Sequence, residues 1–287
     1  MEIVGQGARP SEEPITTEAN HPNPNCMTAA NHREAPTSAP STPAPGRVKI
    51  SASPTHVTQI ARTTESPLVG HLQNAFNAAL ASRSELDPAV LEMDGMSGKK
   101  YRMLINNLIR GLDNPRYLEI GSWVGSTLCS AINRNSVRAT AIDNWSQFGG
   151  PKAQFAANLE RFKTPNAIVS FFEKDFRSVD YTQLGRFNVY MFDGPHSAAD
   201  QFDGIAIAQP ALDEDFILII DDWNWTHTRQ GTMKALYDLK LSVVYSYEIR
   251  TTHDGSHAAV ASQFSDWHNG YFIAVVAKPK GESSAVR

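Results

Sequence analysis

The stretch Tyr117–Ser126 constrains the fold of this chain more than any other, because an apolar run leads directly into a turn bracketed by two glycines. Its sequence reads Tyr-Leu-Glu-Ile-Gly-Ser-Trp-Val-Gly-Ser. Gly121 and Gly125 let a bound molecule approach the backbone where a Cβ would intrude, and the N-terminus of a following helix offers unpaired N–H groups. A ligand should therefore lie against this turn.

An acidic residue in the same stretch indicates the chemistry of that ligand. A dinucleotide fingerprint reads G-x-G-x-x-G and admits a pyrophosphate. Here Trp123 takes the place of the middle glycine, and Glu119 stands two residues before Gly121. The pattern favours a ligand that carries an amine and no phosphate, and it disfavours a nicotinamide oxidoreductase.

The segment Leu118–Ser126 resembles the first motif of class I S-adenosylmethionine (SAM) methyltransferases. The form is the one found in metal-dependent O-methyltransferases of the catechol type and in macrocin-type sugar O-methyltransferases. The resemblance covers roughly residues 93–278 and matches a pattern, with no single protein matched. It implies a Rossmann-like α/β fold and transfer of a methyl group from SAM.

The first 66 residues predict a disordered tail. They contain no Phe, Trp or Tyr and carry nine of the seventeen prolines, interleaved with Ser, Thr, Ala, Asn and Glu. Such a segment cannot bury enough apolar surface to fold. We therefore expect a tail over 1–66, N-terminal helices over 67–112 and a SAM-dependent methyltransferase domain over 113–280.

Two helices are expected between the tail and the first strand. Leu68, Leu72 and Phe76 recur every four residues, which predicts an apolar helix face, and a second helix should run from about 98 to 112. In related methyltransferases such helices form a lid over the cofactor, but a homodimer contact fits this pattern equally well. The segment Met93–Ser97 is either a cofactor-side loop or a plain turn between helices.

Apolar runs then alternate with helical segments. The predicted strands are 117–120, 138–142, 167–173, 187–192, 216–220, 241–249 and 271–277. Short runs rich in Val, Ile, Phe and Tyr between helices indicate parallel strands with helices on both faces. No helical pattern separates the last two runs, so the last strand should return antiparallel. The sequence therefore predicts a doubly wound, seven-stranded, mostly parallel sheet.

Ligands of open α/β sheets bind beyond the carboxyl ends of the strands, so the polar residues there are candidates. Asp143 follows the second strand, 22 residues after Gly121, where a carboxylate can accept hydrogen bonds from both ribose hydroxyls. Asp175 follows the third strand, and the resemblance places an acid there near the adenine amino group. The expected cofactor-binding residues are Glu119, Gly121, Ser122, Gly125, Ser126, Asp143, Asp175 and Asp193.

Three carboxylates follow the fourth and fifth strands: Asp193 after the fourth, and Asp221 and Asp222 after the fifth. Three like charges in a partly desolvated pocket are costly unless a cation neutralises them. All-oxygen ligation fits Mg²⁺. The resemblance implies the same ligands, because metal-dependent O-methyltransferases supply one Asp after the fourth strand and an Asp-Asp or Asp-Asn pair after the fifth.

His196 stands three residues after Asp193, where the catechol-type enzymes have a catalytic lysine. This departure leaves the identity of the base open. His196 is either a base or relay beside Asp193, or a histidine that only hydrogen-bonds the backbone. In the expected reaction a metal-bound substrate hydroxyl loses its proton and takes the methyl group of SAM.

Composition narrows the partners and leaves two other functions open. A net charge of −4 without a visible basic cluster disfavours nucleic acid, and no segment approaches the roughly 18 apolar residues of a membrane span. We expect a cytoplasmic protein that acts on a small hydroxylated metabolite. The alternatives are a metal-independent SAM methyltransferase acting on nitrogen or carbon, and a catalytically inactive scaffold with a methyltransferase fold.

Overall fold

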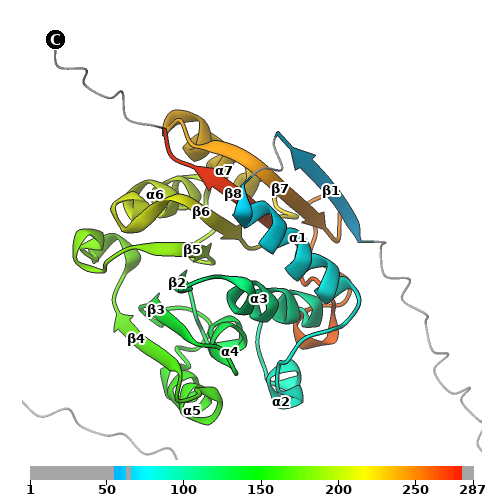
Figure 1. Ribbon diagram of the computed structural model, residues 1–287, viewed down its shortest axis with the longest axis vertical. Coiled ribbons are helices and arrows are strands. Elements are labelled where there is room, and N and C mark those ends of the chain that lie inside the picture. The colour runs from blue at the N-terminus through cyan, green and yellow to red at the C-terminus, as the bar shows by residue number, and fades with distance from the viewer. Residues whose placement is uncertain (1–54, 63–65, 280–287) are drawn as a thin grey trace, which may run out of the picture. The chain divides into compact units, whose positions relative to one another are not determined.

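The computed structural model describes residues 55–62 and 66–279, and these residues form one eight-stranded sheet (Figure 1). The order across the sheet is β1-β7-β8-β6-β5-β2-β3-β4. The strands are β1 His56–Ala61, β2 Arg116–Ile120, β3 Val137–Asp143, β4 Ala167–Glu173, β5 Phe187–Phe192, β6 Leu212–Ile220, β7 Ser242–Arg250 and β8 Tyr271–Ala277.

The sheet is mixed, and one reversed strand decides which segments meet at its edge. Strands β2 to β6 pair in parallel, whereas β8 runs antiparallel between β6 and β7. The predicted antiparallel return of the last strand is confirmed. Because β8 is reversed, its first residues lie at the edge where the parallel strands end.

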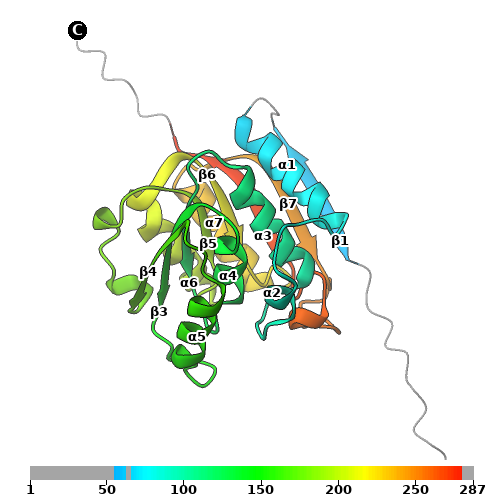
Figure 2. The ribbon, with the colours of Figure 1, turned by 60° about the horizontal axis from the view of Figure 1, so that its bottom comes forward.

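Helices cover both faces of the sheet (Figures 1 and 2). They are α1 Pro67–Leu80, α2 Pro88–Glu92, α3 Lys99–Gly111, α4 Ser126–Ile132, α5 Lys152–Phe162, α6 Ala198–Ala208 and α7 Thr226–Asp238, with 3-10 turns at Phe176–Ser178, Tyr181–Gln183, Gln209–Ala211 and Ser262–Phe264. One apolar cluster joins α1, α3 and α4 to one face, and a second joins α6 and α7 to the other. No helix in the described ranges is long and apolar enough to cross a bilayer.

The two apolar clusters explain the continuous apolar runs of the sequence. Successive side chains of a strand point to opposite faces, so a strand covered on both faces is apolar at most of its positions. Tyr117 belongs to the first cluster and its neighbour Leu118 to the second. All six residues of β5 are buried. Parallel strands between two helical layers therefore follow directly from these runs.

The seven predicted strands are confirmed, but the sheet has an eighth. β1 pairs antiparallel with β7 at the edge of the sheet and lies inside the predicted disordered tail, so that prediction is wrong for His56–Ala61. All six residues of β1 are exposed, and its pairing uses backbone groups, so no apolar pattern marked it. Residues 1–54 of the predicted tail lie outside the described residues.

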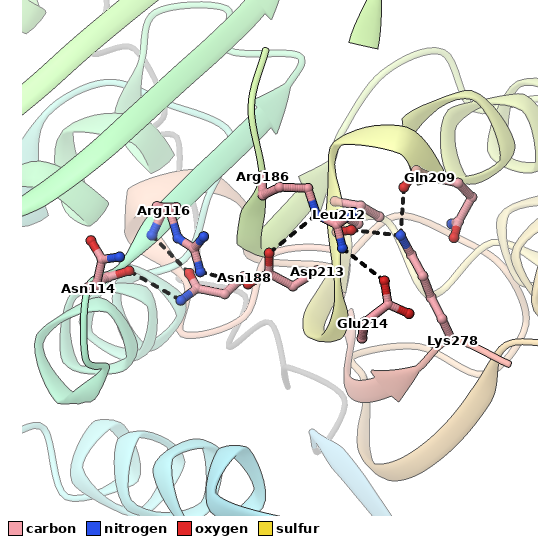
Figure 3. Close-up of polar contacts among 9 residues, drawn as sticks. All are labelled: Asn114, Arg116, Arg186, Asn188, Gln209, Leu212, Asp213, Glu214 and Lys278. Atoms are coloured by element: carbon pink, nitrogen blue, oxygen red, sulfur yellow. Dashed lines mark hydrogen bonds and ion pairs between the residues drawn. The ribbon is translucent and has the colours of Figure 1, made fainter. Parts of the chain in front are cut away.

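Polar side chains tie the strands together at the edge opposite their carboxyl ends (Figure 3). Arg116 donates to the Asp213 carboxylate at 2.6 Å, and its backbone N–H donates to the side-chain oxygen of Asn188 at 2.8 Å. The Lys278 ammonium donates to the carbonyl of Leu212 at 2.6 Å. These contacts join β2, β5, β6 and the end of β8 at one edge, and the candidate site is built at the other.

Candidate functional site

The glycine turn between β2 and α4 is packed against the segment that follows β5. Gly121 has a φ of 84°, and a Cβ at this position would lie 1.8 Å from the carbonyl oxygen of Asp193. Gly125, at a φ of 85°, directly precedes α4. Only glycine fits at 121, because both the left-handed backbone and the close approach exclude a side chain. The turn thereby fixes the position of the chain at Asp193.

Asp143 holds the same turn from the end of β3. One oxygen of its carboxylate accepts hydrogen bonds from the backbone N–H groups of Ser122 and Trp123, both at 2.8 Å. Its other oxygen accepts the N–H of Trp145 at 2.6 Å. These two N–H groups of the turn are therefore already paired within the protein. The oxygen that accepts the Trp145 N–H retains a second acceptor position, whereas the oxygen bound to the turn already accepts two hydrogen bonds, so ribose binding by Asp143 stays a prediction.

Glu119 lies beneath the turn and does not line the cavity. The Tyr117 hydroxyl donates to its Oε2 at 2.5 Å, and the Ser122 hydroxyl donates to its Oε1 at 2.7 Å. The carboxyl group is fully buried, and this burial raises its pKa to about 7. The predicted direct contact between Glu119 and a ligand amine has no support in this arrangement. Glu119 instead holds the side chain of Ser122 within the turn.

A cavity of about 360 Å³ lies at the carboxyl ends of the parallel strands. The predicted site residues that line it are Gly121, Asp143, Asp175, Asp193, His196, Asp221 and Asp222. The predicted cofactor-binding residues outside its lining are Glu119, Ser122, Gly125 and Ser126. Ser126 is buried, and its hydroxyl is 2.9 Å from that of Ser97. The volume lies within the roughly 300–1,000 Å³ typical of small-molecule sites.

The acidic end of the cavity brings a histidine between two carboxylates. His196 Nε2 lies 3.1 Å from Asp222 Oδ2 and 3.6 Å from Asp193 Oδ1. Burial raises the pKa of Asp193 and of Asp221, and the neighbouring carboxylates add to both shifts. Among the residues that the structure describes, Asp221 Oδ1 has no hydrogen-bond partner, although it is buried. The expected meeting of the three carboxylates and His196 in one cavity is therefore observed.

The fit of a metal ion to this acidic end is mixed. The donors are carboxylate oxygens, which hard divalent cations prefer, and the unpaired Asp221 Oδ1 is a buried acceptor that a cation would satisfy. Within residues 55–62 and 66–279, however, no three His, Cys, Asp or Glu side chains form a group that could hold a metal ion. The Mg²⁺ site stays a prediction.

Three residues of the cavity wall come from the segment between β7 and β8: His257, His268 and Asn269. Asn269 donates to Asp222 Oδ1 at 2.8 Å, and its own side-chain oxygen accepts the backbone N–H of Ala258 at 3.0 Å. Asn269 was not among the candidate residues of the sequence. The signal was available in the topology, because a reversed last strand must begin at the ligand-binding edge.

Strained backbone is concentrated around the cavity. Five residues other than glycine in its lining have a positive φ: Trp123, Trp145, Phe148, Asp222 and His268. A left-handed conformation costs an ordinary residue about 1–2 kcal/mol, and such residues cluster at functional sites. Their concentration here supports a binding role for this cavity.

The chain matches a known family over part of its length. Residues 118–223, which include the glycine turn, Asp143 and the three carboxylates, match the family model described as a methyltransferase domain. No curated protein matches the chain. The strand order, the cavity at the strand ends and the family match define the class: the protein is a SAM-dependent methyltransferase with a Rossmann-like α/β fold.

Solved structures with a similar course of the chain include methyltransferases of different kinds. The O-methyltransferase TomG from Streptomyces achromogenes, in complex with SAM, is 13% identical with a TM-score of 0.44, over 72% of this chain and 89% of that one. The O-methyltransferase from Bacillus cereus is 14% identical with a TM-score of 0.42, over 72% and 90%. A proposed RNA methyltransferase from Pyrococcus horikoshii is 13% identical with a TM-score of 0.43, over 73% and 98%. These likenesses do not decide the acceptor.

Proposed function

We propose that this methyltransferase transfers the methyl group of SAM to a hydroxyl oxygen of a small acceptor molecule. The observation that carries the proposal is the position of His196 Nε2 between Asp222 and Asp193 in the cavity wall. Histidine is the side chain best suited to take a proton near neutral pH. An acidic end flanked by Asp193, Asp221 and Asp222 suits a neutral hydroxylated molecule better than a phosphodiester.

The cofactor in this proposal lies along the glycine turn. Asp143, through the one acceptor position that its carboxylate retains, accepts a hydrogen bond from a ribose hydroxyl, and Asp175, which also lines the cavity, lies at the adenine end. This placement directs the methyl group of the sulfonium toward the acidic end. In the reaction the bond between the methyl carbon and sulfur breaks, the bond between that carbon and the acceptor oxygen forms, and His196 takes the hydroxyl proton.

The test of this function is a methyl-transfer screen that compares phenols, sugars and polyketides with a structured RNA. We expect a methylated small-molecule product together with S-adenosylhomocysteine (SAH). His196→Gln should lower kcat by about 100-fold or more, since a general base contributes roughly 10²–10⁴. His227→Gln is the matched control, because His227 is exposed and outside the cavity wall. Equal turnover in the two variants would remove His196 as the base.

We further propose that a divalent ion, Mg²⁺ first, binds Asp193, Asp221 and Asp222. Its support is the carboxylate donor set and the unpaired Asp221 Oδ1. When bound, such an ion polarises the acceptor hydroxyl and lowers its pKa. If no ion binds, His196 lies beside Asp193 and Asp222 without a metal, and the enzyme is a metal-independent methyltransferase.

Calorimetric titration with Mn²⁺ or Mg²⁺ in the presence of SAH separates these alternatives. We expect binding heat in the unaltered chain and none in Asp221→Asn, because the amide has one fewer anionic oxygen for the ion. Asp203→Asn is the control, since Asp203 is exposed on α6 and outside the cavity wall. Methyl transfer that survives a chelator, with no binding heat, would remove the metal and keep the methyltransferase.

A further inference from the structure

Arg102, in α3, is a fully buried arginine whose partners are neutral. Its side chain is 0% exposed, and burial lowers its pKa to about 10. None of the described carboxylates forms an ion pair with it. Burying an unpaired charge is costly, so a buried guanidinium must be held by hydrogen bonds. Those bonds reveal what the residue does.

The guanidinium binds the chain segment that leads from α2 to α3. Its Nε donates to the hydroxyl of Ser97 at 2.9 Å. One terminal nitrogen donates to the carbonyls of Val90 at 2.9 Å and Met93 at 2.7 Å, and the other donates to the carbonyl of Gly95 at 3.2 Å. Because the last carbonyls of a helix have no partner within it, one arginine here satisfies the end of α2 and the segment that follows.

The segment 93–97 held by Arg102 rests on the start of α4, directly after the glycine turn. The hydroxyls of Ser97 and Ser126 are 2.9 Å apart. A Cβ on Gly95 would lie 2.2 Å from that of Ser126, so Gly95 is packed directly against the Ser126 side chain. Met96 lines the cavity. Arg102 is therefore connected to the cavity wall through the segment 93–97, without itself reaching the cavity.

We propose that Arg102 is a positioning residue of the cofactor site, which keeps the segment 93–97 in place as a cavity wall before SAM arrives. Fixing the backbone of a residue costs about 1–2 kcal/mol, so a wall that is already ordered spares the ligand that cost. Lysine cannot replace it, because an ammonium lacks the planar set of five donors that reaches Ser97 and several carbonyls at once. The inference rests on the proposed placement of SAM along the glycine turn.

SAH titration of the full chain, with the melting temperature measured in parallel, tests this role. Arg102→Lys and Arg102→Met should bind SAH about tenfold more weakly, or worse, at temperatures far below their melting points. Amide exchange in 93–97 should become faster in both variants. Arg110→Met is the matched control, because Arg110 lies on the same helix with one exposed hydrogen bond, to the Arg134 carbonyl.

A purely structural arginine would lower the melting temperature and leave the SAH affinity of the folded variant unchanged, which would overturn the inference. Should both Arg102 variants fail to fold, Ser97→Ala carries the test, because it removes only the hydroxyl that joins Arg102 to Ser126. An SAH affinity in Ser97→Ala equal to that of the unaltered chain would contradict the proposal. Absence of SAH binding to the unaltered chain would remove the proposed cofactor site, and this role with it.

Discussion

Glu119 is an acid enclosed within the fold, and both of its carboxyl oxygens accept hydrogen bonds from hydroxyl groups. Its pKa is raised by burial to about 7 in the folded chain, against about 4.3 in an unfolded one. Between these values the folded state keeps a proton that the unfolded state has lost. The contribution of Glu119 to stability therefore falls as the pH rises through this window, and it is constant above it.

Glu119→Gln should remove this dependence, because the amide does not titrate. We expect the free energy of unfolding of the variant, relative to the unaltered chain, to rise by about 3 kcal/mol between pH 4.5 and pH 7.5. Denaturant unfolding at several pH values measures it. Glu160→Gln, at an exposed position of α5, is the control. A difference that stays the same at every pH would show that Glu119 is ionised in the folded chain.

At the scale of elements, the turn between β2 and α4 depends on the close approach of Gly121 to the chain after β5. Gly121→Ala should destabilise the protein by more than about 2 kcal/mol and weaken SAH binding, because the new methyl group overlaps the Asp193 carbonyl. Gly185→Ala is the control that separates the steric clash with Asp193 from the strain of a left-handed backbone. Gly185 has a similar φ of 88°, and a Cβ added there would meet nothing within 4 Å, so only the strain of about 1 kcal/mol applies. If Gly121→Ala and Gly185→Ala lowered the melting temperature equally, the proposed steric clash at Gly121 would be contradicted.

The sequence predicted those elements whose apolar residues form a recognisable pattern. The seven predicted strands carry apolar runs, most of them buried, although only Ala167 is buried in β4, and the glycines mark the turn. β1 has no such pattern, because its residues are exposed and it is held by backbone pairing with β7. The partners of the turn N–H groups and the contact of Asn269 with Asp222 also escaped prediction. Both join residues far apart in the chain, and their distances arise only once the sheet has formed.

At the scale of the whole molecule, β1 lies at the end of the sheet away from the glycine turn. The strands β7, β8, β6 and β5 stand between it and β2. Deleting residues 1–62 should lower the melting temperature by a few degrees, about 2–4 °C for each kcal/mol lost, and leave SAH affinity unchanged. Deleting residues 1–54 keeps β1 and is the matched control. A loss of SAH affinity only in the longer deletion would show that β1 is coupled to the cavity.

The segment between β7 and β8 is fastened at both of its ends. The side-chain oxygen of Asn224 accepts the N–H groups of Thr251 and Thr252, and Asn269 binds Asp222. The stretch between these anchors supplies His257 to the cavity wall, whereas Asp143 and the glycine turn come from other parts of the chain. On the proposed placement of SAM, exchange of this one stretch would therefore alter the cavity wall at His257 and leave in place the residues proposed to bind the methyl donor.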